Sequence, residues 1–179
     1  MRLRHIAIGL AVVTAATFGV PAVASAAPAA HGAAASTIPW KTYRTKPWYD
    51  APGKVCAFGV KTAIVRDGEQ YRTLSSYPDG SPEVQEFRGP LIVRYINAST
   101  GKSAVGNLSG YGWYYYPKSG GYDAYAPSHV GVTVPIGNRG FPAGEWIISG
   151  QSDLIVDGTG AIDIVLIHAT TQDMCRTLA

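Results

Sequence analysis

Residues 91–108 constrain the fold most, because two strand-like segments flank the polar turn Ala98-Ser99-Thr100-Gly101. If these four residues form the loop, strand geometry predicts four opposed pairs: Asn97 with Lys102, Tyr95 with Ala104, Val93 with Gly106, and Leu91 with Leu108. One face is then apolar and carries Leu91, Val93, Tyr95, Ala104 and Leu108. The other face is half polar, with Arg94, Ser103 and Asn107 beside Ile92, Ile96 and Val105. We predict a hairpin whose first face lies in the core.

Other short segments repeat this pattern, with turn signals every 8–12 residues or so. Asp67-Gly68 predicts a hairpin between strands at 58–66 and 69–76. Further strands are expected at 83–87, 129–136, 145–148, 154–156 and 161–168, and a turn of helix at 172–179. No helical period recurs after the first residues. The pattern predicts a single all-β domain, an antiparallel meander that closes as a β-barrel or a β-sandwich.

The first 26 residues have the features of a secretory signal peptide. A basic start precedes an apolar stretch at 6–23 and the small-residue site Ala24-Ser25-Ala26, so we expect cleavage after Ala26. An uncleaved anchor is the alternative, since the stretch borders on spanning length. Loss of Arg2 and Arg4 would leave 13 basic and 12 acidic residues, a net charge of +1. The mature chain would then be extracellular, with no electrostatic attraction to nucleic acid or to a membrane.

The chain has two cysteines, Cys56 and Cys175, which are 119 residues apart. In an exported protein an isolated pair most simply forms one disulfide; two free buried thiols are the alternative. Closing so long a loop should stabilise the fold by about 4–5 kcal/mol in the chain-entropy model. The cysteines bracket nearly every predicted strand, so we place the domain at 55–179.

Residues 27–54 are predicted to be an Ala-rich linker followed by an aromatic arm. The arm carries Trp40, Tyr43, Trp48 and Tyr49 among prolines that argue against a long helix. We expect it to lay these aromatics across the domain. The alternative is an exposed patch that binds a partner.

Catalytic and metal-binding patterns are incomplete in this sequence. Thr100-Gly101-Lys102-Ser103 resembles the end of a phosphate loop, but Ile96 stands where the first glycine belongs. Asp153, Asp157 and Asp163 lack the ligand order of a calcium loop. A hydrolase could use His129 or His168 as base, and Glu145 with Asp163 could form a carboxylate pair, although nothing in the sequence brings these two together. We predict no cofactor and no metal, and consider a non-enzymatic role more consistent with the sequence.

The hairpin at 111–125 is the main candidate for ligand binding. Alternation places Tyr111, Trp113 and Tyr115 on one face, and Tyr114 and Tyr116 on the other. Tyrosine and tryptophan combine an apolar ring with a polar edge, which suits them to stack on sugars. The predicted ligand-binding residues are Trp113, Tyr114, Tyr115, Tyr116, Tyr122 and Tyr125. The alternative is a ladder of cross-strand aromatic pairs that stabilises the sheet.

Several short motifs occur together: Cys56, Gly89-Pro90-Leu91, Thr100-Gly101-Lys102, Asn107-Leu108-Ser109-Gly110 and the end Cys175-Arg176-Thr177-Leu178-Ala179. Over residues 55–179 the chain resembles a family of uncharacterised small secreted actinobacterial proteins with one early Cys and a Cys-x-x-Leu-Ala end. The resemblance implies export and a compact β domain, and it supplies no catalytic residues. Residues 111–125 are more aromatic than the pattern of that family.

Four functional hypotheses follow. The first is a secreted, non-catalytic binding or envelope-associated protein. The second is a carbohydrate-binding module that holds cell-wall or extracellular polysaccharide at residues 111–125. The third is a hydrolase with a histidine base. The fourth is a lipocalin-like carrier, which requires a closed barrel with a cavity.

Overall fold

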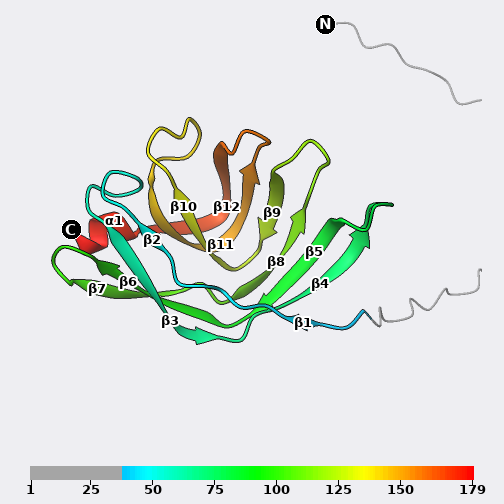
Figure 1. Cartoon of the computed structure of the whole chain (residues 1–179), viewed down its shortest axis with the longest axis horizontal. Coiled ribbons are helices and arrows are strands. Elements are labelled where there is room, and N and C mark those ends of the chain that lie inside the picture. The colour runs from blue at the N-terminus through cyan, green and yellow to red at the C-terminus, as the bar shows by residue number, and fades with distance from the viewer. Residues whose placement is uncertain (1–37) are drawn as a thin grey trace, which may run out of the picture. The chain divides into compact units, whose positions relative to one another are not determined.

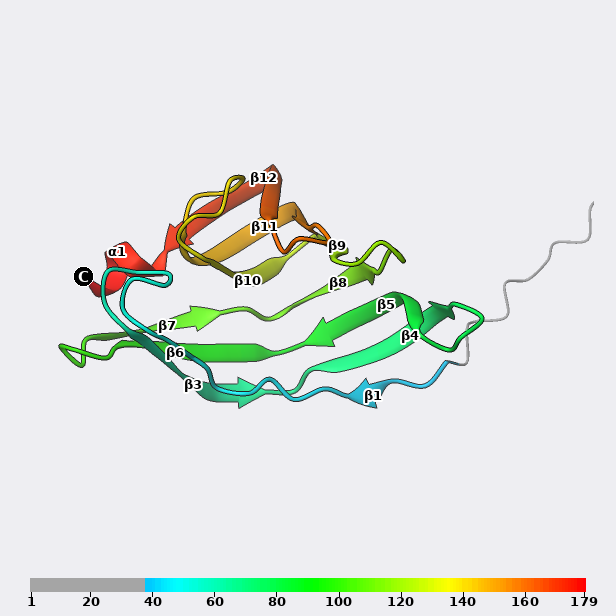
Figure 2. The same cartoon turned by 45° about the horizontal axis from the view of Figure 1, so that its top comes forward.

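The computed structural model describes residues 38–179, which form two antiparallel β-sheets and one short helix (Figures 1 and 2). The predicted signal peptide and most of the predicted Ala-rich linker lie outside the described residues. Within the described part, no helix is long and apolar enough to cross a bilayer.

The larger sheet, sheet A, has eight strands. Its order is β1 (Lys41–Thr42), β4 (Gln70–Ser76), β5 (Pro82–Gly89), β8 (Gly110–Tyr115), β9 (Tyr122–Ala126), β11 (Gly144–Val156) and β10 (His129–Val134). The remaining strand, β12 (Ile162–Asp173), pairs with β11 along its whole length, so β9 and β10 share the other side of β11. Sheet B has the order β2 (Tyr49–Asp50), β3 (Val60–Asp67), β6 (Leu91–Asn97) and β7 (Ser103–Asn107).

The hairpin predicted at 91–108 is confirmed as β6 and β7. Tyr95 pairs with Ala104 and Val93 with Gly106, as the turn length required. The backbone N–H of Asn97 donates to Lys102, and that of Leu108 donates to Leu91. The predicted core face is buried along β6, where Leu91, Val93 and Tyr95 are at most 7% exposed.

The Asp67-Gly68 hairpin prediction is wrong. β3 pairs with β6 in sheet B, whereas β4 pairs with β5 in sheet A, so Gly68 lies where one long strand passes between sheets. Asp67 and Gly68 do not form a hairpin turn but bond to a neighbouring strand and to the adjacent residue. The Gly68 N–H donates to the Pro90 carbonyl, and the Asp67 carboxylate accepts from the Glu69 N–H. Gly68 joins β3 to β4, and Pro90 joins β5 to β6 on the neighbouring strand. The two residues are in contact, so the two long strands bend at the same place.

The meander therefore consists of long bent strands that run through both sheets. β3 continues into β4, β5 into β6, and β7 into β8, and each neighbour pairs antiparallel in both sheets. Figure 2 shows these strands passing from sheet B into sheet A. Bends of this kind are how strands switch between packed sheets. The two sheets fit the predicted sandwich rather than the alternative, since residues 38–179 do not close into one barrel.

Two hydrophobic clusters hold the sheets. The first joins sheet B to β11 and the C-terminal helix: Val55, Cys56, Val60, Leu91, Val93, Tyr95, Ile147, Met174 and Leu178. The second lies on the opposite face of β11, within sheet A: Ala124, Val132, Val134, Ile148, Leu154 and Ile164. Adjacent residues Ile147 and Ile148 enter different clusters because strand side chains alternate. The first half of β11 is thus buried on both faces at Ile147 and Ile148.

The predicted disulfide is confirmed between Cys56 and Cys175, whose Cα atoms are 5.5 Å apart. Cys175 lies in α1 (Met174–Leu178), the turn of helix predicted at 172–179. Asp173 caps this helix by accepting from the Arg176 N–H. Leu178 is fully buried against sheet B, so the covalent bond and the packing hold the same end of the chain.

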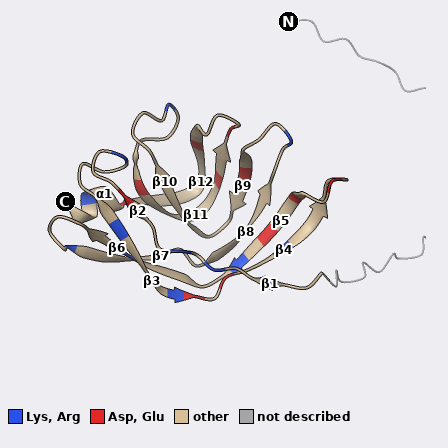
Figure 3. Ribbon diagram, viewed as in Figure 1, with Lys and Arg blue, Asp and Glu red and all other residues tan. Residues whose placement is uncertain are grey.

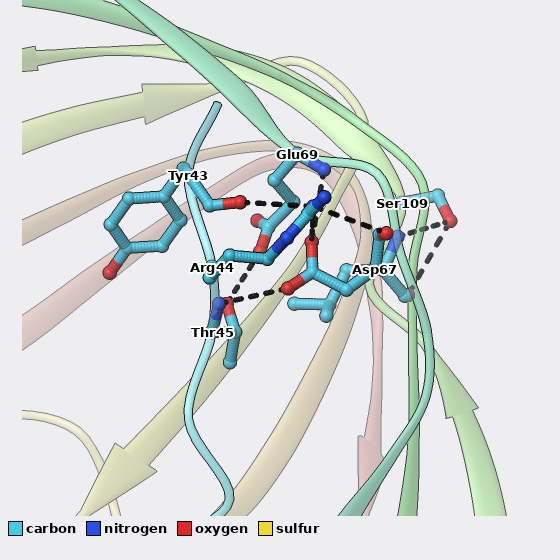
Figure 4. Close-up of polar contacts among 7 residues, drawn as sticks. Tyr43, Arg44, Thr45, Asp67, Glu69 and Ser109 are labelled. Carbon is cyan, nitrogen blue, oxygen red and sulfur yellow. Dashed lines mark hydrogen bonds and ion pairs between the residues drawn. The ribbon is translucent and has the colours of Figure 1, made fainter. Parts of the chain in front are cut away.

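The aromatic arm lies across both sheets. β1 pairs with β4 in sheet A and β2 with β3 in sheet B, so residues 41–50 pass from one sheet to the other. Figure 4 shows how the arm is held between them: the Thr45 N–H donates to Asp67 and its hydroxyl donates to Glu69, while Arg44 lies 3.4 Å from Asp67.

Candidate functional site

The six predicted ligand-binding aromatics divide between the two faces of sheet A. Trp113, Tyr115 and Tyr125 lie on the outer face, where Tyr111 also lies. Tyr114, Tyr116 and Tyr122 lie on the inner face and pack together, with ring centroids 5.5 to 6.5 Å apart. One set therefore faces outward and the other lines the interior.

The outer set belongs to a straight row that crosses six strands. Each member pairs directly with the next: Arg72, Glu86, Trp113, Tyr125, Asp153 and Val165, on β4, β5, β8, β9, β11 and β12. Directly opposed residues project from the same face of a sheet. Five strand spacings make the row roughly 24 Å long. We call these six residues the outer row.

The centre of the outer row is an aromatic platform. The rings of Trp113 and Tyr125 are 6.0 Å apart and 20° from parallel, and Tyr111 meets Trp113 edge-on. Tyr111 and Tyr115, which flank Trp113 along β8, are 50% and 47% exposed. The Gln151 amide donates to the Tyr125 hydroxyl and fixes that ring.

Polar groups of both signs surround the platform. Arg72 bonds to Glu86 at 2.7 Å, and Trp40 from the arm lies beneath the guanidinium groups of Arg72 and Arg88, 4.6 and 3.8 Å from its ring centre. Figure 3 shows acidic segments on β5 and β9 of this sheet. Carboxylates beside the rings disfavour a phosphate backbone, which such a surface would repel.

The inner aromatics border a cavity of about 350 Å³ beneath the arm. Its walls include Tyr43 and Trp48 from the arm, Phe87 from β5, and Tyr114 and Tyr116 from β8. Burial raises the pKa of the Tyr114 hydroxyl far above its ordinary value, so this phenol stays neutral and can donate a hydrogen bond. Burial also raises the pKa of Glu69, which lines the same cavity, despite its bond from Thr45.

The structure does not bring Glu145 and Asp163 together as a carboxylate pair. Glu145 lies at the start of β11, whereas Asp163 pairs with Ile155 near its end, ten residues and roughly 33 Å along the strand. Glu145 instead lies by Asp50 of the arm. Burial, followed by the interaction with Asp50, raises the pKa of Glu145 to about 8.

Sequence analysis missed Asp50, because a single aspartate near a proline gives no periodic signal. Trp40 and Gln151 were also missed as neighbours of the platform. Their places depend on the path of the arm and on the register between β9 and β11. That a carboxylate flanks the two rings on each side is visible only once that register is known.

The two candidate histidines, His129 and His168, lie on different strands. His129 pairs with Ser149 and His168 with Gln151, so the imidazoles flank β11 from opposite sides. The Ser128 hydroxyl is taken by the backbone of Tyr111. Asp157 closes the β11–β12 turn by accepting from Thr159 and Ala161. Within residues 38–179, no group of three or more His, Cys, Asp or Glu is placed to hold a metal ion.

Fold and surface together define a disulfide-linked, two-sheet antiparallel β-protein with an aromatic row on its larger sheet. No family model, curated protein or solved structure matches the chain. The resemblance to small secreted actinobacterial proteins therefore stays a prediction.

Proposed function

We propose that this is an exported, non-catalytic protein that binds neutral polysaccharide, on a cell wall or outside the cell, along the outer row. The observation that carries the proposal is the register that aligns Trp113 and Tyr125 with Glu86 and Asp153. Ring faces offer apolar contact to the faces of sugar rings, and the flanking carboxylates accept hydrogen bonds from hydroxyls.

The ligand is expected to be extended and uncharged. A row of roughly 24 Å suits a chain rather than a single small molecule. Both signs of charge are present at Arg72 and Glu86, and these two charges already satisfy each other. A strongly anionic or cationic polymer would meet groups of its own sign along the row.

Export is part of the proposal. The predicted signal peptide supports it, and so does the disulfide between Cys56 and Cys175, since such bonds persist in oxidising compartments. The test is to express the whole chain in an actinobacterial host and sequence the N-terminus of protein from the medium. We expect it to begin at Ala27, and retention of the intact chain in cells would contradict export.

Binding is tested by pull-down on insoluble polysaccharides, including cellulose, chitin and peptidoglycan. We expect wild type to bind at least one of them, and Trp113→Ala and Tyr125→Ala to lose most of that binding. Tyr49→Ala is the matched control, because Tyr49 is 55% exposed but lies on sheet B. Equal binding by Trp113→Ala and wild type would refute the proposed site. So would an equal loss with Tyr49→Ala.

Measuring polysaccharide cleavage distinguishes a binding protein from the hydrolase alternative. If any bound polysaccharide is cleaved, the double variant His129→Ala/His168→Ala should be compared with wild type. A binding protein shows no turnover with either. Cleavage that the double variant abolishes would favour the hydrolase.

A further inference from the structure

A second cavity, of about 230 Å³, lies between the arm and the two sheets, away from the outer row. Its walls come from the arm, β6, β10, β11 and the segment after β7: Trp48, Tyr95, Leu108, Gly131, Val132, Thr133 and Glu145. Trp48, Leu108 and Gly131 also line the larger cavity, so the two adjoin.

Glu145 is the carboxyl in the wall of this cavity, and it is 1% exposed. Its Oε1 accepts from the Thr133 hydroxyl at 2.9 Å and from the Trp48 indole N–H at 3.4 Å. Neither partner carries charge. The ion pairs among residues 38–179 are Arg44–Asp67 and Arg72–Glu86, so no cation of the described chain neutralises Glu145. A buried carboxylate without a counter-ion is unstable, and it either holds a proton or takes a cation.

Asp50 adds a second acceptor beside Glu145. Its Oδ2 is buried and has no hydrogen-bond partner among residues 38–179, with Glu145 taken as ionised. A proton held by Glu145 supplies that missing donor when the cavity is empty. Burial first, and this hydrogen bond second, raise the pKa of Glu145. The site is therefore acidic in composition, and the proton on Glu145 removes one negative charge until a cation replaces it.

Aromatic rings form the rest of the wall around this carboxyl. Trp48 and Tyr95 meet edge-to-face, with centroids 6.0 Å apart and planes 81° from parallel, so they present two nearly perpendicular surfaces. Ring faces attract ammonium groups, most strongly in a site that excludes water. A hard divalent cation is disfavoured, since it requires six or more oxygen ligands. The wall of the cavity offers two hydroxyls and one carboxyl, with the Asp50 carboxyl beside it, among apolar side chains.

We propose that this cavity binds a small organic cation, with its ammonium head against Trp48 and Tyr95 and Glu145 as its counter-ion. Binding exchanges one proton: Glu145 gives its proton to the solvent and the ammonium takes its place. The titratable groups in the wall are Tyr95 on β6 and Glu145 on β11, and Asp50 on β2 lies beside Glu145. Burial and Glu145 raise the pKa of the Tyr95 phenol and keep it protonated, so the exchanged proton is that of Glu145.

The experiment is calorimetric titration of the full mature chain with choline and with 3,3-dimethylbutan-1-ol, its uncharged equivalent. We expect choline to bind at least about tenfold more tightly. Titrations in two buffers of different ionisation enthalpy should show release of about one proton per choline at pH 6.5. Failure of choline to bind up to 50 mM, or equal binding of the neutral analogue, would overturn the proposal.

Variants assign the site. Glu145→Gln keeps the size of the side chain and an oxygen to accept from Thr133, and it should weaken choline binding by about tenfold or more and abolish proton release. Glu69→Gln is the matched control, because Glu69 is the partly buried carboxyl of the neighbouring cavity and should leave affinity within about twofold. Unchanged affinity in Glu145→Gln, with its fold verified by circular dichroism, would refute the assignment.

Polysaccharide binding at the outer row should be the same in both variants. Failure of one proposal therefore does not imply failure of the other.

Discussion

The rings of Trp113 and Tyr125 stack because the two residues are direct partners across β8 and β9. Glu86 on β5 and Asp153 on β11 continue the same line, so ring contact and carboxylates are spaced by the hydrogen-bond ladder itself. A surface set by register is rigid before a ligand arrives. Preformed surfaces of this kind lose little conformational entropy on binding.

Replacing Trp113 by alanine should cost about 1–2 kcal/mol of unfolding free energy, since it removes two aromatic pairs, with Tyr125 and with Tyr111, from a partly exposed face. The variant should remain folded and usable in binding tests. Urea denaturation measures the change. Tyr115→Ala is the control: its ring is 47% exposed and pairs with Asp123, so the loss should stay near 0.5 kcal/mol. Equal losses for both would show that the stacked pair contributes nothing specific.

Removing the Cys56–Cys175 bond should lower the unfolding free energy by about 4–5 kcal/mol. The bond closes a loop of 119 residues, and the entropy that it removes from the unfolded chain grows with loop length. The double variant Cys56→Ala/Cys175→Ala and reduced wild type should give matching urea curves. A midpoint equal to that of the oxidised protein would contradict the prediction.

The corner between β5 and β6 can be tested at Gly89. Its φ is +131°, and an added Cβ would lie 2.5 Å from the Gly68 carbonyl oxygen on the neighbouring strand. Gly89→Ala should therefore destabilise the fold by more than about 2 kcal/mol. Gly80→Ala is the matched control, since Gly80 also has a positive φ of +85° but nothing lies within 4 Å of its Cβ position. Thermal unfolding of the two variants separates backbone strain from the close approach of the strands.

The all-β class, the central hairpin and the disulfide were predictable because each rests on local or covalent chemistry. Alternation over a four-residue turn fixes which side of β6 is buried, and only one cysteine pairing exists. The path between sheets was not predictable. Asp67-Gly68 has the composition of a tight hairpin. Pro90, between the neighbouring strands β5 and β6, instead contacts Gly68, and the Asp67 carboxylate accepts a hydrogen bond from the arm.

The ends of the strands and the neighbours of the aromatic residues were likewise not predictable, because pairing with distant parts of the chain decides both. The sequence predicts separate strands at 145–148 and 154–156, but β11 is continuous over both and runs through Gly150. The pairing with β12 shifts register by a bulge at Gln151 and Ser152, so the strand does not end there. The division of the tyrosines into two faces followed from alternation alone. Which carboxylates stand beside them required the partners of β8, β9 and β11.

Asp67 should control how firmly the arm is held. Its carboxylate accepts from the N–H groups of Thr45 and Glu69, at 3.0 and 3.1 Å. Asp67→Ala should speed hydrogen exchange at residues 43–48 while leaving β6 protected, because it removes the bond that holds the arm and leaves the first hydrophobic cluster intact. Arg44→Ala is the control, with a side chain 64% exposed and little expected effect. Uniform exchange across the arm and β6 in Asp67→Ala would show that the arm does not open independently.

The free energy of unfolding should fall as pH rises from about 4.5 to 8, because Glu145 holds a proton in the folded protein over this range. Its pKa is raised from 4.5 to about 8 in the folded protein, so between these values the folded state keeps a proton that the unfolded chain has lost. The contribution is complete below pH 4.5 and disappears as pH passes about 8. In Glu145→Gln an amide takes the place of the titrating carboxyl and can donate to Asp50 at every pH. Urea denaturation at pH 5, 6.5 and 8 should therefore give a smaller decline for Glu145→Gln than for wild type. Other groups titrate equally in both proteins, so parallel declines would mean that Glu145 is ionised in the folded protein throughout this range.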